Sequence, residues 1–319
     1  MAVTLTELRE AYSARAVDTL RSSLLWTGLA NRDWEADAQT AYKVQIPVRQ
    51  ADSAHTATSR TRNADWKTAT DATHTLTPFT IDQETEVGST IQYLDERETM
   101  FSLVGEIADI HAYQMAREID ESVRDVMVGG VKAGNQTDVG TASVYVNENG
   151  EATGTGAPAL VYNAIDELSI RTRRANVGRT GLAPEMVWAV LSPGLWRSLR
   201  SYLVERRYAD ALSMEALRDD RVLMPQAGFV GRLFGINLYE SNLAPTSLVD
   251  DSGTDKKYQV ILSGTTKATT FASRPPVTQV LTPETNQTGP RWALRQVRTY
   301  GRMVVDDDRL WATRVRAEA

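Results

Sequence analysis

Residues 98–128 have the sequence ETMFSLVGEIADIHAYQMAREIDESVRDVMV, which contains the clearest periodic pattern in the chain. Apolar side chains return in it every three or four residues, which predicts one amphipathic helix with a single buried stripe. Gly129 and Gly130 follow and predict its end. At 1.5 Å per residue such a helix is about 45 Å long, which is typical of a structural spine. The stripe consists of Met100, Val104, Ile107, His111, Met115, Ile119 and Val123.

The opposite face of this helix is charged. Arg117 and Glu121 are four residues apart, and so are Asp120 and Arg124. Oppositely charged side chains at this spacing form ion pairs on solvent-exposed helix faces. Both pairs are therefore predicted to lie on the surface.

Two extended runs precede the helix. In residues 41–49 apolar and polar side chains alternate, with Tyr42, Val44 and Ile46 on the apolar face, which predicts a half-buried strand. Pro47 indicates that this strand is an edge or bulged strand. Residues 75–81, which include Phe79 and Ile81, form the second run. Together they predict a hairpin.

The segment between the two runs, residues 50–75, is unusually polar. It contains seven threonines, and its only apolar side chains are alanines and Trp66. Such a segment buries too little surface to offset its own ordering entropy. It is either a disordered insertion or an extended loop that another chain orders. In the second case its cations and Trp66 would contact that chain, and the candidates are Arg49, Arg60, Arg62, Trp66 and Lys67.

The remaining patterns alternate between helix and strand. Residues 4–25 predict a helix, which either packs on its own domain or forms an arm on a neighbouring subunit; the stretch around Trp26 and Trp34 is expected to be irregular. Residues 186–191 predict a buried strand, and Ser192 is the N-cap of a helix that ends near residue 206. Further predictions are a helix at 159–174 and strands at 142–146, 229–240, 258–262 and within 275–319.

Composition excludes several classes of function. The 319 residues include no cysteine, so disulfides, thiolate metal sites and cysteine nucleophiles are absent. The net charge of −6 argues against tight binding of nucleic-acid phosphates. No apolar run approaches the length of a membrane span, and the first twenty residues do not resemble a signal peptide.

No motif predicts a catalytic, cofactor or metal site. His55, His74 and His111 lack metal-ligand spacing, and the sequence has no phosphate loop or nucleophile elbow. The G-x-G-x-x-A string at 154–159 lacks the tight turn of a dinucleotide site and fits a loop better. Asp306, Asp307 and Asp308 are either part of a cation site or, as we favour, a solvated turn.

The order of these elements along nearly the whole chain resembles the tailed-phage major capsid family, with the Hong-Kong-97-type fold. Residues 41–86 look like its extended hairpin, the E-loop, and residues 98–128 like its spine helix. The most specific local match is GFVGRLFGINL at 228–238, where a turn with Gly228, Gly231 and Gly235 feeds a strand. Other matching stretches are 79–96, 186–196, 261–272, 300–301 and 308–315.

The resemblance implies an α+β fold: a phage capsid fold with a long spine helix, an extended β-hairpin (E-loop), and peripheral and axial domains. It implies an N-terminal arm (1–37), the E-loop hairpin and lead-in (38–95) and the peripheral domain with the spine helix (96–157). The axial domain (158–274) and strands that return to the peripheral domain (275–319) complete the chain.

The function implied is that of a structural protein and not of an enzyme. It is a major capsid protein that self-assembles into pentamers and hexamers of an icosahedral shell around double-stranded DNA. The interface is expected in the E-loop, at Arg49, Arg60, Arg62, Trp66 and Lys67, and Gly228, Gly231 and Gly235 are expected to shape a structural turn. No cofactor is implied.

The resemblance also implies partners and a location. The partners are other copies of the chain, a portal protein, a decoration protein on shells that carry one, and packaged DNA held without sequence-specific contacts. Only residues 1–37 precede the hairpin, so a separate scaffolding protein is expected. The protein would assemble in the host cytoplasm and remain in the virion, with no membrane involved.

Two other functions remain open. An encapsulin-like compartment shell has a similar fold but stores cargo enzymes inside a cell. An α+β enzyme would need a converging acid, base and nucleophile, and no such set is found in the sequence.

Overall fold

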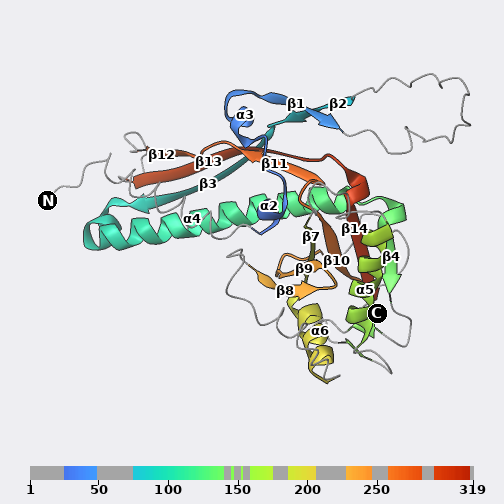
Figure 1. Ribbon diagram of the computed structural model, residues 1–319. Helices are drawn as coiled ribbons and strands as arrows, with labels where there is room; N and C mark the ends of the chain where they lie inside the picture. Colours follow the sequence, from blue (N-terminus) through green and yellow to red (C-terminus); the bar gives the residue numbers. More distant parts are fainter. Residues whose placement is uncertain are drawn as a thin grey trace, which may run out of the picture.

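The computed structural model describes residues 25–48, 75–139, 145–146, 152–153, 159–174, 186–205, 228–245, 258–281 and 291–316. Figure 1 shows two bodies joined along one long helix. One is a four-stranded sheet that lies along the helix. The other is a six-stranded sheet near the helix C-terminus.

The long helix, α4, spans Tyr93–Gly129, so it begins before the predicted residue 98 and ends at the predicted glycines. Four residues of its stripe are buried as the periodicity predicted: His111, Met115, Ile119 and Val123 are each at most 2% exposed. Ile107, which is also in the predicted stripe, is only partly buried. Figure 1 shows α4 running beneath the sheet formed by β3 (Gln83–Gln92), β11 (Thr269–Ser273), β12 (Val277–Leu281) and β13 (Arg291–Val304).

Strand β3 is an element that the sequence did not predict. Its residues, QETEVGSTIQ, are largely polar and contain little of the β-branched apolar pattern that marks a strand. It pairs antiparallel with β13 along its whole length, from Gln83 opposite Tyr300 to Gln92 opposite Arg291. Tertiary pairing therefore makes this segment a strand.

The six-stranded sheet has the order β4-β14-β10-β7-β9-β8. Its central strand β7 (Val187–Leu191) is buried at every position. Val187, Ala189 and Leu191 pack with α5 (Ala159–Arg174) and α6 (Pro193–Glu205), whereas Trp188 and Val190 pack with α4. The sheet is thus a middle layer, which explains a continuous apolar run. The other strands are β4 (Gln136–Val139), β8 (Phe229–Leu233), β9 (Ile236–Glu240), β10 (Tyr258–Thr265) and β14 (Leu310–Arg316).

Two local predictions hold for this part of the chain. Helix α5 has the predicted bounds, and α6 begins after Ser192, whose Oγ accepts a hydrogen bond from the Leu195 N–H at 3.4 Å. Within the predicted strand 142–146 the structure describes only β5 (Tyr145–Val146), which pairs with β6 (Ala152–Thr153). The string at 154–159 lies outside the described residues except for Ala159.

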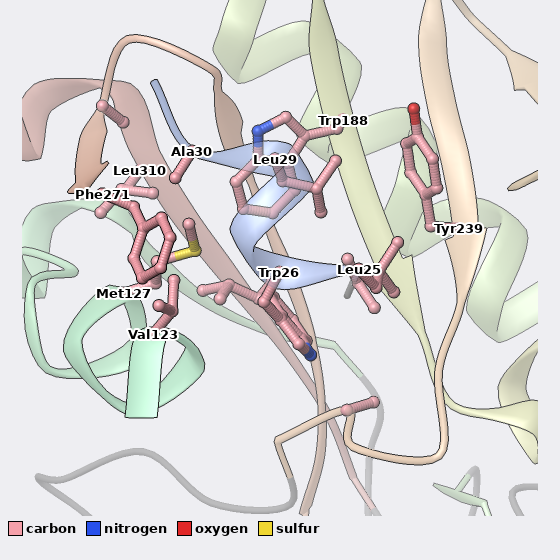
Figure 2. Packing of buried hydrophobic residues seen from close by; sticks show 14 of the residues in the cluster. Leu25, Trp26, Leu29, Ala30, Val123, Met127, Trp188, Tyr239, Phe271 and Leu310 are labelled. Carbon is pink, nitrogen blue, oxygen red and sulfur yellow. The ribbon is translucent and has the colours of Figure 1, made fainter. Parts of the chain in front are cut away.

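The segment around Trp26 and Trp34 was predicted to be irregular, and this prediction is wrong. It contains α2 (Trp26–Leu29) and α3 (Glu35–Thr40). Trp26 is fully buried, and its ring meets Trp188 edge-to-face at 6.3 Å between centroids (Figure 2). Short helices whose own N-cap side chain makes no hydrogen bond depend on such tertiary contacts, which a local pattern does not reveal. Of the predicted helix at 4–25, only Leu25 is described.

The predicted hairpin is present. Strand β1 (Lys43–Val48) pairs antiparallel with β2 (Thr75–Thr80), from Lys43 opposite Thr80 to Val48 opposite Thr75. These strands form a sheet of their own, so Pro47 lies on an edge strand as predicted. Figure 1 shows the hairpin above the four-stranded sheet, on the side away from α4. No helix of the described chain is both long and apolar enough to cross a membrane.

Candidate assembly surfaces

The hairpin is anchored at its base by a small apolar core. Val44, Ile46 and Phe79 are buried there against Ala272 of the four-stranded sheet. The backbone of Gly301 on β13 lies so close beneath β2 that a Cβ at this position would be 2.4 Å from the carbonyl oxygen of Thr80. The base of the hairpin is therefore fixed on the sheet.

Polar contacts hold the segment that leads into the hairpin. Arg274 donates from Nε to the carbonyl oxygen of Ala38 and from Nη2 to that of Ala41, both at 3.2 Å. Ser273 Oγ lies 3.1 Å from a carboxylate oxygen of Glu35. These contacts tie α3 to β11.

The five residues predicted to form the E-loop interface, Arg49, Arg60, Arg62, Trp66 and Lys67, lie outside the described residues. The described strands nevertheless carry exposed apolar side chains. Leu76, opposite Pro47, is 57% exposed, and Tyr42, next to β1, is 62% exposed. The alternation had placed Tyr42 on the buried face, but it precedes the strand and points to solvent. These side chains extend the candidate surface to the described part of the hairpin.

Asp120 is the residue whose role the sequence most clearly concealed. It is 2% exposed, and its carboxylate accepts backbone N–H bonds from Leu25, Trp26 and Thr27 at 2.9, 3.2 and 3.1 Å. These bonds satisfy the donors at the start of α2. Burial raises the pKa of this carboxyl, and the three N–H bonds oppose that shift. Asp120 thereby fixes the point at which the N-terminal segment meets α4.

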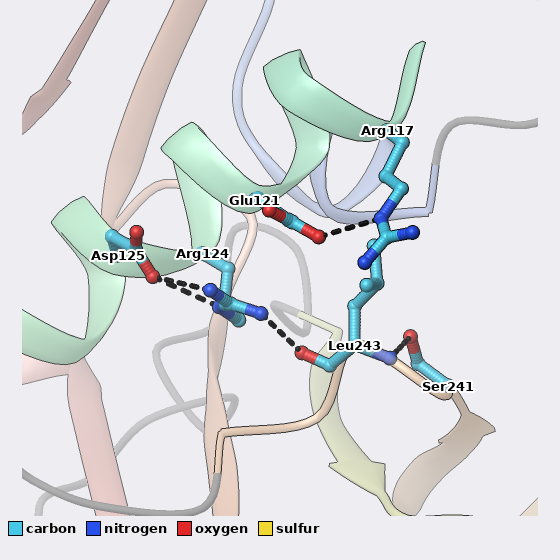
Figure 3. A network of polar contacts seen from close by, with 6 residues as sticks. All are labelled: Arg117, Glu121, Arg124, Asp125, Ser241 and Leu243. Carbon is cyan, nitrogen blue, oxygen red and sulfur yellow. Dashed lines mark hydrogen bonds and ion pairs between the residues drawn. The ribbon is translucent and has the colours of Figure 1, made fainter. Parts of the chain in front are cut away.

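The predicted ion pair between Asp120 and Arg124 is therefore wrong. Arg124 instead contacts Asp125 at 2.8 Å and donates to the carbonyl oxygen of Leu243 at 3.2 Å (Figure 3). The other predicted pair is present, with Arg117 Nε 2.8 Å from Glu121 Oε1. Spacing alone did not distinguish the two pairs, because Asp120 is buried against the start of α2 whereas Arg117 is exposed.

The three glycines predicted to shape a structural turn all have positive φ: 81° at Gly228, 152° at Gly231 and 87° at Gly235. Gly235 and Phe234, with φ of 52°, form the two-residue connection between β8 and β9. Such a hairpin turn needs positive φ at both positions, which glycine adopts without strain. Gly231 lies where the register of the two strands shifts.

The three consecutive aspartates form a turn with its own cations. Lys132 Nζ lies 2.7 Å from Asp307 and 2.8 Å from Asp308, and Arg309 Nε lies 2.7 Å from Asp306. The two carboxylates raise the pKa of Lys132. The carboxylate oxygens lie within 4.8 Å of one another, yet they are already paired with side-chain cations. The arrangement fits the predicted solvated turn between β13 and β14.

His111 is buried between α4 and β3. Its Nε2 lies 2.6 Å from Ser89 Oγ, and burial lowers its pKa. His55 and His74 lie outside the described residues. A buried histidine with a serine partner beneath a sheet is a packing residue here, as the position in the helix stripe predicted.

Solved structures share the fold of this chain. No protein-family model and no curated protein matches the chain. Among solved structures, the capsid of Ralstonia phage GP4 aligns over 94% of this chain and 91% of its own, with a TM-score of 0.61 and 12% identity.

The chain has the phage capsid fold. The structure of Mycobacterium phage Che8 supports the same conclusion, with a TM-score of 0.58, 19% identity and coverage of 91% of this chain and 90% of that one. A virus-like particle from Pyrococcus furiosus is also similar, with a TM-score of 0.53, 9% identity and coverage of 95% and 98%. The long helix α4 and the β1–β2 hairpin, which the sequence predicted as elements, are both present in the described chain.

Proposed function

We propose that this chain is the major capsid protein of a tailed phage, which self-assembles into the pentamers and hexamers of an icosahedral shell around double-stranded DNA. The observation that carries the proposal is the match to the GP4 capsid over more than nine tenths of both chains. A match of that extent leaves little of the chain outside the shell-forming architecture.

The described surfaces support assembly better than catalysis. A hairpin stands above the body with exposed Tyr42 and Leu76, and its connecting segment is too polar to form a core. We propose that this segment gains its order on a neighbouring subunit, through Arg49, Arg60, Arg62, Trp66 and Lys67. A shell subunit of this kind needs no catalytic residue and no cofactor.

We propose two domains around the spine helix. The peripheral domain comprises α4 with the sheet of β3, β11, β12 and β13, and the axial domain comprises the six-stranded sheet with α5 and α6. Strands β4 and β14, from segments that the sequence assigned to the peripheral domain, pair within the six-stranded sheet. The proposed boundaries therefore follow the sheets rather than residues 157 and 274.

The proposed partners follow from shell assembly. They are further copies of the chain, a separate scaffolding protein, a portal protein, a decoration protein where the shell carries one, and DNA without sequence-specific contacts. The net charge of −6 is compatible with an inner wall that does not bind packaged DNA tightly. The protein would be part of the virion after assembly in the host cytoplasm.

Negative-stain electron microscopy of the purified full chain tests this function. We expect closed shells of uniform diameter, formed by the chain alone or with its scaffolding protein. A chain that stays monomeric under both conditions contradicts the proposal.

The similarity to the Pyrococcus furiosus particle favours one alternative, a cellular compartment shell. The contents of native particles separate the two functions. Nuclease-protected double-stranded DNA supports the phage capsid, whereas a packaged enzyme supports the compartment.

A further inference from the structure

One face of the spine helix carries four exposed side chains in a line. Glu106, Ile110, Tyr113 and Arg117, here called the α4 stripe, follow one another at intervals of four, three and four residues. Ile110 is 50% exposed and Tyr113 is 54% exposed, although both are large and apolar. The buried residues Ala112 and Met115 lie on the opposite side of the helix, so the stripe points away from the sheet.

The spacing of the stripe is that of a helix–helix seam. Alternating steps of four and three residues keep side chains on one line, and two such lines pack against each other. Isolated exposed apolar residues are ordinary, but two adjacent ones at this spacing form a short contact surface. A second helix is the partner that this spacing fits.

The charges of the stripe identify that helix. The order along α4 is acid, apolar, apolar, base, so the stripe is complementary to itself when reversed. In an antiparallel pair of copies, Glu106 faces the partner's Arg117 and Ile110 faces the partner's Tyr113. In a parallel pair like charges would meet. A self-complementary surface is what a twofold contact between identical subunits requires.

Arg117 can bind a carboxylate of a second copy while it keeps its ion pair with Glu121. Glu121 fixes its Nε at 2.8 Å within the same helix (Figure 3). A guanidinium has five N–H donors and binds more than one carboxylate. The intrahelical pair therefore orients Arg117 for a second acid.

We infer that the α4 stripe is a twofold contact between two copies of this chain, with their spine helices antiparallel. The inference rests on the proposed function and deepens it. Rings of five and six subunits close through contacts between unlike surfaces, whereas neighbouring rings related by a twofold axis must meet through like surfaces. Two apolar residues and two charges from each copy form a weak contact, which becomes effective when a shell repeats it.

Cross-linking within assembled shells tests the contact, because the chain has no cysteine of its own. Shells are co-assembled from the full-length single variants Ile110→Cys and Tyr113→Cys, which carry tags of different length. After oxidation we expect a covalent dimer that contains one copy of each variant, since disulfides form only between Cα atoms closer than about 7 Å. The matched control co-assembles Gln114→Cys with Glu118→Cys, which are exposed on the same helix but off the stripe, and should give no such dimer.

Charge reversal gives a second readout. Glu106→Arg and Arg117→Glu should each reduce the yield of shells, and the double variant should restore it; Glu118→Arg is the control and should leave the yield unchanged. If the cysteine variants form normal shells but no mixed dimer, the twofold contact is wrong and the proposed function stands. If the chain without substitutions forms no shells, the proposed function itself is wrong. If the charge variants form normal shells that no longer co-purify with a second protein, the α4 stripe binds that protein and the twofold contact is wrong.

Discussion

Asp120 shows how one buried carboxylate joins two distant parts of the chain. It accepts hydrogen bonds from three consecutive backbone N–H groups that lie more than ninety residues earlier in the sequence. Exposed i,i+4 ion pairs such as that of Arg117 and Glu121 contribute little to stability by comparison. The contact between residues 25–27 and α4 therefore depends on Asp120, whose burial cannot be predicted from its neighbours in the sequence.

Replacement of Asp120 tests this role. Asp120→Ala leaves three buried N–H groups without an acceptor, and we expect the free energy of unfolding to fall by about 3 kcal/mol or more. Asp125→Ala removes a carboxylate from the exposed side of the same helix and should change it by less than about 0.5 kcal/mol. Urea denaturation of both variants measures the difference. Equal losses would mean that the three hydrogen bonds do not stabilise the junction.

His111 predicts a pH dependence of stability. Burial lowers its pKa in the folded protein below the ordinary value of 6.5, so the unfolded chain binds more protons just below pH 6.5. The free energy of unfolding should therefore decrease as the pH falls through that range. In His111→Gln this part of the decrease should be absent, while His74→Gln should retain it. Denaturation curves between about pH 7 and pH 5 check the prediction, and identical curves for both variants would exclude it.

The hairpin depends on its packing against the four-stranded sheet rather than on its own pairing. Its two strands form an isolated sheet, and such hairpins are marginal without a surface to pack on. Gly301 permits that packing, because a side chain there would meet the backbone of Thr80 and the ring of Phe79. The hairpin thus packs most closely on the four-stranded sheet at position 301.

Gly301→Ala should displace the hairpin from the sheet. We expect a loss of roughly 1 to 3 kcal/mol, typical of overpacking, together with faster proteolysis between β1 and β2. Gly134→Ala is the control, because a Cβ at that position has no atom within 4 Å. If the two variants are cleaved at the same rate, the close approach does not hold the hairpin.

At the scale of the whole molecule we expect folding and assembly to depend on different parts of the chain. Apolar clusters of the described residues fill the space between α4 and the two sheets and between the six-stranded sheet and its helices. Residues 50–75 have only alanines and Trp66 as apolar side chains, so we expect them to add little to such a core.

Replacement of residues 49–74 by an Asn-Gly turn tests this separation. Such a turn closes a two-residue hairpin between β1 and β2. We expect an unchanged thermal midpoint in calorimetry and a loss of shells in electron microscopy. A large drop in the midpoint would show that the segment contributes to the core of its own subunit.

Much of the fold followed from local patterns. The bounds of α5, the end of α4, the two hairpin strands and the buried strand β7 all matched the sequence, because each has a periodicity of its own that the core preserves. The candidate interface could be predicted less completely from the sequence. Its loop residues lie outside the described chain, and the α4 stripe became visible only once the buried face of α4 was known.

Elements whose side chains repeat with the period of a helix or a strand could be predicted from the sequence, since that period is set by neighbouring residues along the chain. That β3 is a strand, that α2 and α3 are helices and that Asp120 is buried became known only from the folded structure. Each of these depends on a partner far away in the sequence: β13 for β3, Trp188 for Trp26, and the start of α2 for Asp120. Contacts of that range leave no periodic trace in a single sequence.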